Sequence, residues 1–390
     1  MKISKKARVI AFYLPQFHPI PENDKHWGKG FTEWTNVGKA QPLFKGHYQP
    51  RVPADLGYYD LRLPEVREAQ AEMAREAGVE GFCYWHYWFG NGKKLLEHPF
   101  QEVLKTGKPD LPFCLGWANH SWTTKTWEKR KTSYKDEMIV EQLYPGEEDY
   151  IAHFNYVLPA FKDERYITVD GKPIFLVFDP LKIPNSKKFI DLWQSLAKEN
   201  GLKGIHFVGS TENSGGKSLS DLGKKRYKFL PTQESDKYYD RVLNLGFDAV
   251  ASLGLYRAES LVGGKFRRLL KIVLKRVFKV SLMEKYQYKS IMKNYYVKED
   301  SWENVYPSLL PQWDKSARSG TAKGIYINST PELFQDSIEE VLKLVQDKKD
   351  EHKILFLKSW NEWAEGNYVE PDLKFGNGYL KALKNTLITD

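Results

Sequence analysis

The sequence is poor in several features that would assign it to a protein class at once. It holds two cysteines among 390 residues, Cys83 and Cys114, and each falls inside an apolar run. We therefore expect buried thiols and no disulfide framework. No apolar run approaches the roughly 18 residues of a membrane span. The apolar stretch Val9 to Leu14 is too short for a signal peptide and polar residues follow it at once, which predicts a cytoplasmic protein.

Several ligand-binding motifs are missing as well. The sequence contains no Asp-x-Asp, no Gly-x-Gly-x-x-Gly and no phosphate-binding loop. Their absence argues against a metal-dependent nucleotide-sugar transferase and against a glycine-rich nucleotide site. There is also no His-Glu-x-x-His and no Cys-x-x-Cys, so we expect neither a metal nor another cofactor.

Aromatic rings and positive charge are present in excess. Aromatic residues make up 14% of the chain, 12 of the rings are tryptophans, and the formal net charge is +9. Many rings stand beside polar residues, as in a groove that stacks sugars or bases. The positive charge favours an anionic surface. Because it is concentrated in one segment instead of alternating with the rings, we do not expect a nucleic-acid partner.

Eight strand-like runs alternate with helical patterns along the chain. The strand-like runs are Arg8–Leu14, Val79–Tyr87, Leu111–Trp117, Pro173–Phe178, Gly204–Ser210, Phe247–Ser252, Asn304–Gln312 and Lys353–Trp360. The helical patterns are Leu63–Gly78, Glu148–Lys162, Ser186–Asn200 and Pro331–Asp347. This order predicts an α/β fold, a (β/α)₈ TIM barrel with long βα loops that takes residues 1–390 as a single domain. A doubly wound open sheet is the alternative, because counting strands cannot show closure.

The last strand leads into the most distinctive stretch of the sequence, HKILFLKSWNEWAEGNYVEPD. An apolar run, Ile354 to Leu357, ends there in a cluster of carboxylates and indoles. Catalytic groups of parallel sheets lie just beyond the carboxyl ends of strands. Neighbouring carboxyl groups can hold different protonation states, because each ionised group raises the pKa of the other. Glycosidic-bond chemistry needs one acid and one base, so we predict that Glu362 and Glu365 are catalytic. The alternative is that they flank a solvated loop.

Polar groups and rings follow the other predicted strands too. Rings offer flat apolar faces to the C–H surfaces of a sugar, while amides, carboxylates and imidazoles bind its hydroxyls. We therefore predict substrate contacts from Tyr13, Gln16, His18, Trp34, Trp85, His86, Tyr87, Trp117, Asn119, Trp313, Asn361, Trp363 and Glu370. For each residue the alternative is an ordinary rim or core position. For His18 and His86 that means a hydrogen-bonded histidine, which we favour over a metal ligand.

The first predicted loop, residues 19–62, is long and rich in proline, glycine and rings. A loop of this size in a compact domain is normally either functional or disordered, and its rings argue for an ordered cover over the barrel mouth. Glu33 lies between Phe31 and Trp34 in this loop. It is a candidate third acid, but we favour a structural salt bridge.

Residues 263–298 differ from the rest in composition. Arginines and lysines are distributed there among apolar residues at helical spacing, namely Phe266, Leu269, Leu270, Val273 and Val277. A basic amphipathic helix is typical of an element that lies on an anionic membrane or on a partner. On this interpretation the segment is a helical insertion that holds the protein at the inner membrane, beside lipid-linked oligosaccharides. The alternative is a solvated helix with its apolar face on the barrel.

Several long motifs resemble the WbsX-like proteins of bacterial polysaccharide gene clusters. The motifs are YLPQFHPIPEND, WGKGFTEWTNV, EGFCYWHYWF, PFCLGWAN, VDGKPIFLVF and WNEWAEGNYVEPD, and the resemblance covers nearly the whole chain. These proteins are similar to glycoside hydrolase family 99, the endo-acting α-mannosidases and α-mannanases, which are (β/α)₈ barrels. The catalytic motif of that family, Glu-Trp-His-Glu, matches Glu362-Trp363-Ala364-Glu365. Ala364 replaces its histidine, so a preference for mannose stays open.

The resemblance implies a retaining reaction in which the 2-hydroxyl of the substrate attacks the anomeric carbon and forms a 1,2-anhydro sugar. It implies that Glu362 deprotonates this hydroxyl, and that Glu365 protonates the leaving oxygen and later activates the acceptor. Water or a sugar hydroxyl can open the same intermediate. Both a hydrolase and a transferase of surface polysaccharide (O-antigen or capsule) metabolism therefore fit, and a non-catalytic glycan-binding barrel is the further alternative.

Overall fold

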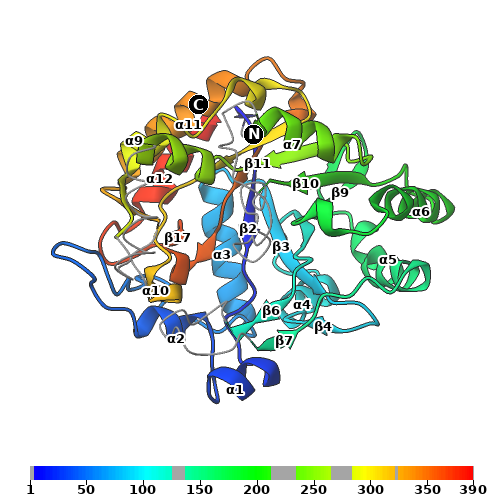
Figure 1. The fold of residues 1–390 in the computed structure, drawn as a ribbon, viewed down its shortest axis with the longest axis horizontal. Helices are drawn as coiled ribbons and strands as arrows, with labels where there is room; N and C mark the ends of the chain where they lie inside the picture. Colours follow the sequence, from blue (N-terminus) through cyan, green and yellow to red (C-terminus); the bar gives the residue numbers. More distant parts are fainter. Residues whose placement is uncertain (1–3, 125–136, 212–233, 265–282, 321–323, 390) are drawn as a thin grey trace, which may run out of the picture.

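The computed structural model describes residues 4–124, 137–211, 234–264, 283–320 and 324–389. Eight strands form its central sheet, and each pairs in parallel with the next. The last strand pairs with the first, which closes the sheet into a barrel (Figure 1). In chain order they are β2 (Arg8–Tyr13), β3 (Gly81–Trp88), β5 (Phe113–Trp117), β9 (Lys172–Val177), β10 (His206–Ser210), β11 (Ala249–Ser252), β13 (Val305–Leu309) and β15 (Ile354–Leu357). The predicted (β/α)₈ barrel is confirmed and the open sheet is excluded.

Helices surround the barrel between these strands (Figure 1). They are α3 (Pro64–Glu76), α4 (His98–Thr106), α5 (Glu147–Phe161), α6 (Ser186–Glu199), α7 (Glu234–Leu243), α11 (Pro331–Val345) and α12 (Gly378–Leu387). Local sequence sets their ends. Pro64 occupies the first turn of α3, where a missing N–H is tolerated, and the Thr330 side chain caps α11 by accepting from the Leu333 N–H. The helices α4, α7 and α12 were not predicted.

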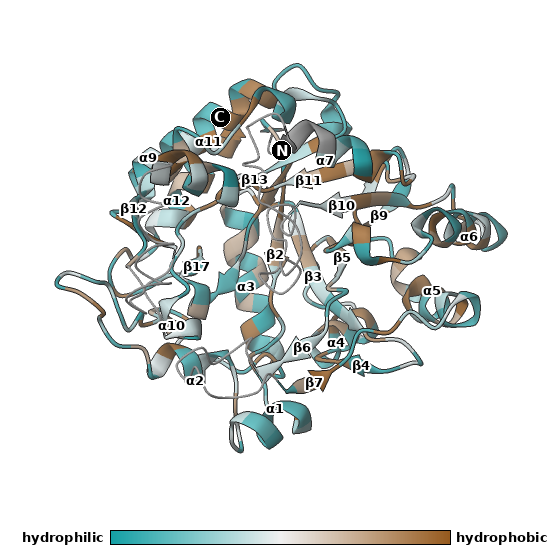
Figure 2. Cartoon of the chain, viewed as in Figure 1, coloured by the Kyte–Doolittle hydropathy of each residue, from teal (hydrophilic) through white to brown (hydrophobic). Residues whose placement is uncertain are grey.

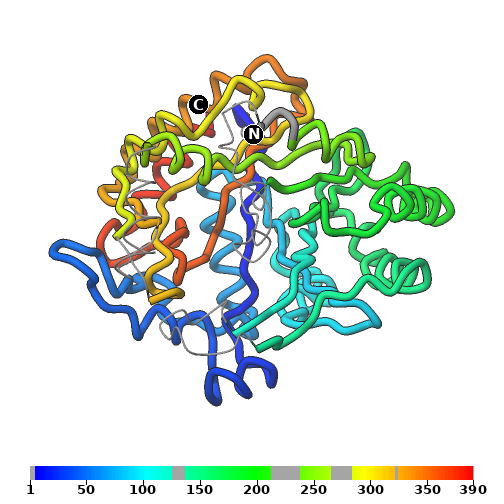
Figure 3. The backbone as a smooth tube through the Cα atoms, viewed as in Figure 1, coloured from blue at the N-terminus to red at the C-terminus, as the bar shows by residue number. Residues whose placement is uncertain are grey.

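Short strands and short helices lie in the connections around the barrel. They are β1 (Ser4–Lys5), β4 (Lys94–Leu95), β6 (Trp122–Thr123), β7 (Met138–Val140), β8 (Thr168–Val169), β12 (Lys285–Gln287), β14 (Ile325–Ile327), β16 (Asn361–Glu362), β17 (Asn367–Tyr368), β18 (Ile388–Thr389), α1 (Pro21–Trp27), α2 (Glu33–Gly38), α9 (Tyr288–Met292), α10 (Ser316–Ser319), η2 (Pro180–Lys182), η3 (Lys298–Ser301), η4 (Asp350–His352) and η5 (Trp363–Glu365). Because β1 pairs with β18, the two ends of the described chain lie side by side (Figure 3).

The predicted basic insertion, 263–298, is only partly described, since residues 265–282 lie outside the described residues. Its later part is not the continuous helix that we expected. It forms the short strand β12, which pairs with β14, and the short helix α9. Tyr286 and Tyr288 are buried there, so this part packs onto the rest of the protein.

The barrel strands carry the apolar core, which Figure 2 shows as brown ribbons inside more polar helices. Phe12 of β2 stacks on Trp85 of β3 and on Phe356 of β15, with ring centroids 4.7 and 5.1 Å apart. Cys83 and Cys114 face each other in the register of β3 and β5, and both are buried and free, as predicted.

A buried polar anchor ties the long first loop to the barrel. Asp314 follows β13, and its Oδ2 accepts hydrogen bonds from His47 Nε2 at 2.8 Å and Gln49 Nε2 at 2.9 Å. Because His47 Nδ1 accepts from the Leu43 N–H, its Nε2 carries the proton. Arg51 lies 3.8 Å from the same carboxylate. We call His47, Gln49, Arg51 and Asp314 the Asp314 anchor. It confirms that the loop is ordered.

The Asp314 anchor should contribute strongly to stability. Burial alone would raise the pKa of Asp314, but the hydrogen bond from His47 and the charge of Arg51 lower it to about 2. A pKa below the unfolded value means that the stabilisation is present above about pH 4 and is lost as the pH falls toward 2. We expect Asp314→Asn to lower the free energy of unfolding by about 3–5 kcal/mol at pH 7, because Arg51 is left buried without its counter-ion. The loss should shrink at pH 3. Urea unfolding followed by tryptophan fluorescence measures both.

Asp60→Asn is the matched control. Asp60 pairs with Arg62, whose side chain is 53% exposed, so this change should cost less than about 1 kcal/mol. Equal losses in the two variants would contradict the role of the Asp314 anchor.

Candidate active site

The two predicted catalytic glutamates lie on a tight hairpin beyond the carboxyl end of β15. Glu362 ends β16 and Glu365 ends the turn η5. The Ser359 hydroxyl accepts from the Glu362 N–H at 2.9 Å, and the Asp314 N–H donates to the Glu365 carbonyl at 2.7 Å. Glu362 and Glu365 are 7% and 6% exposed. Strand, hairpin and anchor therefore hold both carboxyl groups in fixed places.

Cationic side chains approach both glutamates. Arg318 of α10 donates from Nη1 to Glu365 Oε1 at 2.7 Å. Lys315 Nζ lies 3.5 Å from the same oxygen. Lys358, which follows β15, places Nζ 3.9 Å from Glu362 Oε2. We call this group the charged cluster. Its members are Glu33, Lys315, Arg318, Lys358, Glu362 and Glu365.

Glu33 joins the charged cluster from the first loop. Its Oε1 accepts from Arg318 Nη2 at 2.7 Å and from the Ala364 N–H at 3.2 Å. The predicted structural salt bridge is thus confirmed. The elements α2, α10 and η5 pack on one another as a result, and Figure 1 shows α2 and α10 close together beside the hairpin.

The cations decide the charge of Glu365. Burial alone would raise the pKa of this carboxyl, but the charges of Arg318, Lys315 and Lys358 lower it. The cations beside Glu365 therefore favour its ionised form.

Two predicted sugar contacts lie beside the pair. Burial and the charge of the Glu362 carboxyl raise the pKa of Tyr87, so the two groups are close enough for their charges to interact. The Trp313 ring lies under the ammonium groups of Lys315 and Lys358, 4.4 and 5.8 Å from its centroid. Both residues stay predictions as substrate contacts.

Other predicted contacts line the first loop or the barrel interior. The Gln16 carbonyl accepts from the Glu33 N–H at 3.0 Å, and within the described residues its buried Nε2 has no hydrogen-bond acceptor. Burial lowers the pKa of His18 to about 4, so this imidazole is neutral at pH 7. Trp85 stacks on Phe12 inside the barrel, and Trp34 packs 5.4 Å from the ring of Trp363. These four also stay predictions.

The predicted substrate contact is wrong for Tyr13, His86 and Trp117, because their side chains leave the barrel on its outer face. The Tyr13 hydroxyl donates to Gln70 of α3 at 2.6 Å. His86 Nε2 lies 2.8 Å from His153 Nε2 of α5. The Trp117 ring packs against the same histidine at 4.9 Å. All three fill the space between strands and helices.

Two predicted amides hold the backbone instead of a sugar. Asn361 accepts from the Leu14 N–H at 2.8 Å and donates to the Leu14 carbonyl at 3.1 Å. Asn119 accepts from the Asp179 N–H at 2.7 Å and donates to the Asp179 carbonyl at 2.9 Å. Both are fully buried, so the predicted substrate contact is wrong for them.

Glu370 also has a structural role, as an acceptor of hydrogen bonds from buried side chains. Its two oxygens accept from Trp360, Gln70, Tyr59 and Trp363, at distances of 2.6 to 2.9 Å, which uses all four acceptor positions of a carboxylate. Burial raises its pKa to about 7, although these hydrogen bonds oppose the rise. Glu370 orients Trp363, whose ring stacks on Tyr368 at 3.8 Å. Direct sugar binding by Glu370 was a wrong prediction, because its oxygens are all occupied by these donors. Trp363 stays a prediction as a substrate contact.

The sequence analysis missed three members of the charged cluster: Lys315, Arg318 and Lys358. Lys358 carried a signal, since a lysine directly after a buried apolar strand is costly without a nearby anion. Lys315 lies in the loop after β13 and Arg318 in the short helix α10 that follows it, and no local pattern distinguishes either residue. Only the folded chain brings them to Glu365.

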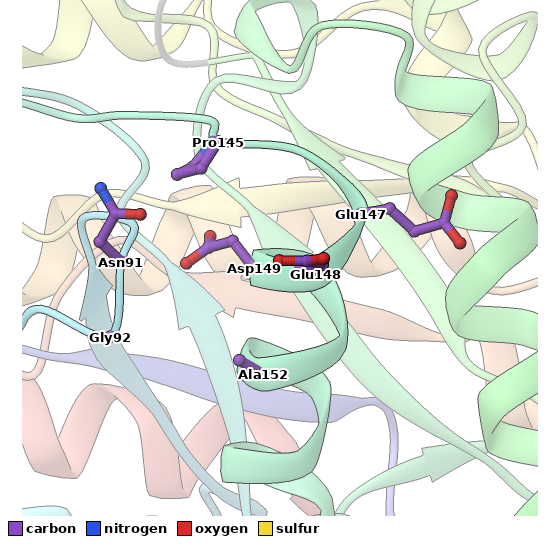
Figure 4. A pocket seen from close by; sticks show the side chains of 7 residues that line it. All are labelled: Asn91, Gly92, Pro145, Glu147, Glu148, Asp149 and Ala152. Carbon is purple, nitrogen blue, oxygen red and sulfur yellow. The ribbon is translucent and has the colours of Figure 1, made fainter.

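Two hollows of the surface lie away from the glutamates. The larger, of about 360 Å³, is lined by Asn91, Gly92, Pro145, Glu147, Glu148, Asp149 and Ala152 at the start of α5 (Figure 4). The smaller, of about 10 Å³, lies beside Trp85, His86 and Tyr87. Neither is lined by Glu362 or Glu365. No three His, Cys, Asp or Glu side chains of the described residues gather in a group that could hold a metal ion.

Comparison with known proteins gives relatives over nearly the whole chain. It is 32% identical over 385 residues to the uncharacterized protein WxcX of Xanthomonas campestris pv. campestris, strain B100, and equally so to that of strain ATCC 33913. The match covers 98% of this chain and 50% of each relative, so the chain spans about half the length of these curated relatives.

Solved structures share the fold. A glycoside hydrolase-like protein superposes with a TM-score of 0.60 at 15% identity, over 100% of this chain and 96% of the other. The GH99 endo-alpha-mannosidase from Bacteroides thetaiotaomicron superposes with a TM-score of 0.55 at 14% identity, over 98% of this chain and 96% of the other. At such identities the likeness supports the barrel and its loops, not the reaction.

The sequence family is broader evidence than any single relative. The family model described as glycosyltransferase WbsX matches residues 9–383. This range includes the whole charged cluster and all eight barrel strands, apart from the first residue of β2. The chain belongs to the WbsX glycosyltransferase family.

Proposed function

We propose that this chain is a carbohydrate-active enzyme of bacterial surface polysaccharide metabolism, and that Glu362 and Glu365 carry out its chemistry on an α-glycosidic bond. The observation that supports the proposal is the geometry of the pair. Two buried carboxyl groups lie on one short turn past the last barrel strand, and Arg318 and Lys315 place positive charge beside Glu365. An acid and a base at fixed positions are the minimum for this reaction.

The proposed reaction keeps the anomeric configuration without a covalent sugar–enzyme bond. The base takes the proton of the substrate 2-hydroxyl, whose oxygen attacks the anomeric carbon while the acid protonates the departing oxygen. In an α-mannoside the 2-oxygen and the aglycone are trans-diaxial, so backside attack is available. Each positioned proton transfer contributes roughly 10²–10⁴ to the rate. On this proposal Trp313, whose ring lies under Lys315 and Lys358, and Tyr87 would contact the sugar ring.

We expect Glu362→Gln and Glu365→Gln each to lower turnover by about 10²-fold or more, because each amide can no longer exchange a proton with the substrate. Glycan binding should persist, since the amides keep shape and polarity. The assay incubates purified protein with lipid-linked oligosaccharides and polysaccharide extracted from cells that lack the gene, and mass spectrometry follows the products. Binding of the same glycans is measured separately by native mass spectrometry.

Glu72→Gln is the matched control, because the Glu72 side chain is 60% exposed on α3. Unchanged turnover in both active-site variants would remove the pair from the mechanism. Glycan binding without any turnover by the unaltered protein would instead favour a non-catalytic barrel.

Transfer and hydrolysis remain the two forms of the proposal, because water or a sugar hydroxyl can open the same anhydro sugar. The family description favours transfer, and the fold of an endo-acting mannosidase is equally compatible with hydrolysis. Cells without the gene distinguish them. A precursor that is one sugar short indicates transfer, and an untrimmed glycan indicates hydrolysis.

We further propose that the protein meets lipid-linked substrates at an anionic membrane surface through the basic segment 263–298. The proposal rests on the sequence of this segment, because residues 265–282 lie outside the described residues. In the described part of the chain, no helix is both long and apolar enough to cross a bilayer. The proposed contact is with the membrane surface, where each basic residue contributes about 1 kcal/mol.

We expect the protein to co-sediment with phosphatidylglycerol vesicles and not with phosphatidylcholine vesicles. Replacing Lys271, Lys275 and Arg276 by Ala should weaken binding about 10²-fold, because three basic residues contribute about 3 kcal/mol. High salt should weaken it as well. Replacing the exposed Lys187, Lys188 and Lys198 of α6 removes the same charge elsewhere. If both triple variants lose binding equally, net charge and not this segment is responsible.

A further inference from the structure

Asn367 of β17 lies directly opposite Glu362 of β16 in the final hairpin, where the two residues form an antiparallel pair. Directly opposed side chains of such a pair lie on the same face, with Cβ atoms about 4.5–5.5 Å apart. The Asn367 amide is therefore a close neighbour of a catalytic candidate. It was not among the predicted site residues.

The other pair of the hairpin, Asn361 and Tyr368, has a structural task. Successive side chains of a strand alternate between its two faces, so this pair lies on the face opposite to that of Glu362 and Asn367. Asn361 bonds to both backbone groups of Leu14. One face of the hairpin thus joins the scaffold, and the other carries Glu362 with Asn367 beside it.

The Asn367 amide is buried without a protein partner. The residue is fully buried, and neither its Nδ2 nor its Oδ1 has a hydrogen-bond partner among the described residues. Burial in this state costs free energy, because the hydrogen bonds that the amide makes to water in the unfolded chain are not replaced. Asn23 and Asn36 of the first loop share this property. Of the three, Asn367 alone is paired with a catalytic candidate.

We propose that Asn367 is a substrate-contacting residue, which binds the sugar oxygen next to the oxygen that Glu362 engages. A side-chain amide offers two donors and an acceptor, so it can bind a hydroxyl or a glycosidic oxygen. With Glu362 at the 2-hydroxyl, as the resemblance to glycoside hydrolase family 99 implies, the adjacent oxygen is the one on C3. The inference rests on the proposed function, because it concerns the same substrate in the same site.

The state of the amide in the free protein suits this task. Because Asn367 makes no hydrogen bond to the rest of the described chain, its donors and acceptor are available to a sugar without breaking a contact of the fold. A buried polar group of this kind also discriminates, since a ligand that lacks the matching oxygen leaves it unpaired. The amide carries no charge to balance an acidic group, so we assign to this position an uncharged oxygen of a neutral sugar.

Thermal unfolding of the full chain, followed by circular dichroism, tests the free protein without a glycan. Leucine has the branched shape of asparagine but no hydrogen-bonding group. We expect Asn367→Leu to keep or raise the unfolding temperature, because it removes an unpartnered amide. Asn361→Leu, on the other face of the same hairpin, should lower it by several degrees, because both backbone groups of Leu14 lose their partner. An equal fall in the two variants would assign Asn367 to the scaffold and overturn the proposal.

Native mass spectrometry then measures the binding of glycans extracted from cells that lack the gene. Asn367→Leu should weaken binding about 10-fold or more, because the buried sugar oxygen loses its partner. Asn23→Leu is the matched control, since Asn23 is equally buried and unpartnered but lies on α1, apart from β17 (Figure 1). It should bind the glycans as the unaltered protein does. Unchanged binding by Asn367→Leu would contradict the proposal.

Asn367→Ala guards against a leucine that does not fit. Alanine is smaller than asparagine, and this variant should show the same loss of binding. If the unaltered protein binds the glycans without turnover, the proposed enzyme is wrong and the comparison at Asn367 still holds. If it binds none of them, the proposed function fails, whereas a fall in the unfolding temperature of both Asn367 variants overturns the role of Asn367 by itself.

Discussion

The ion pairs of Arg318 join parts of the chain that are far apart in sequence. Glu33 lies 285 positions before Arg318, and Glu365 lies 47 positions after it. Burying these charges costs free energy, which only close mutual contact can offset. The charged cluster can therefore form only when the first loop, the loop after β13 and the final hairpin are all in place. The integrity of the candidate site is in this way coupled to closure of the barrel mouth.

The Asp314 anchor supplies the rigidity that the charged cluster needs. It fixes the first loop through His47 and Arg51 and, through its backbone N–H, holds the carbonyl of Glu365. Gly366 follows with φ of +54°, and a Cβ at this position would lie 2.9 Å from both Arg51 and Asp314. Only glycine lets the hairpin turn this close to the anchor. The turn at Glu365 and Gly366 therefore contacts the Asp314 anchor through its backbone and carries a catalytic candidate on the Glu365 side chain.

The sequence predicted the barrel because strand and helix patterns are local, and each of the eight predicted runs overlaps a barrel strand, with ends that differ by a few residues. It could not predict which side chains face the mouth. Parallel strands are buried on both faces, so Tyr13 and Phe12, or His86 and Tyr87, look alike in the sequence although one of each pair points to the helices. The cations of the cluster were hidden for another reason. Lys315 and Arg318 reach Glu33 and Glu365 only in the folded chain, and no local sequence pattern predicts such long-range contacts.

The final hairpin shows that surroundings, more than residue type, decide what a carboxyl group does. Glu370 and Glu365 lie five positions apart. Neutral N–H and O–H donors surround Glu370, and burial raises its pKa to about 7. Cations surround Glu365, and its pKa is lowered although it is buried as well. The first carboxyl holds two indoles in place. The second is kept ionised by the cations beside it, so two carboxyl groups on one loop differ in charge state because their neighbours differ.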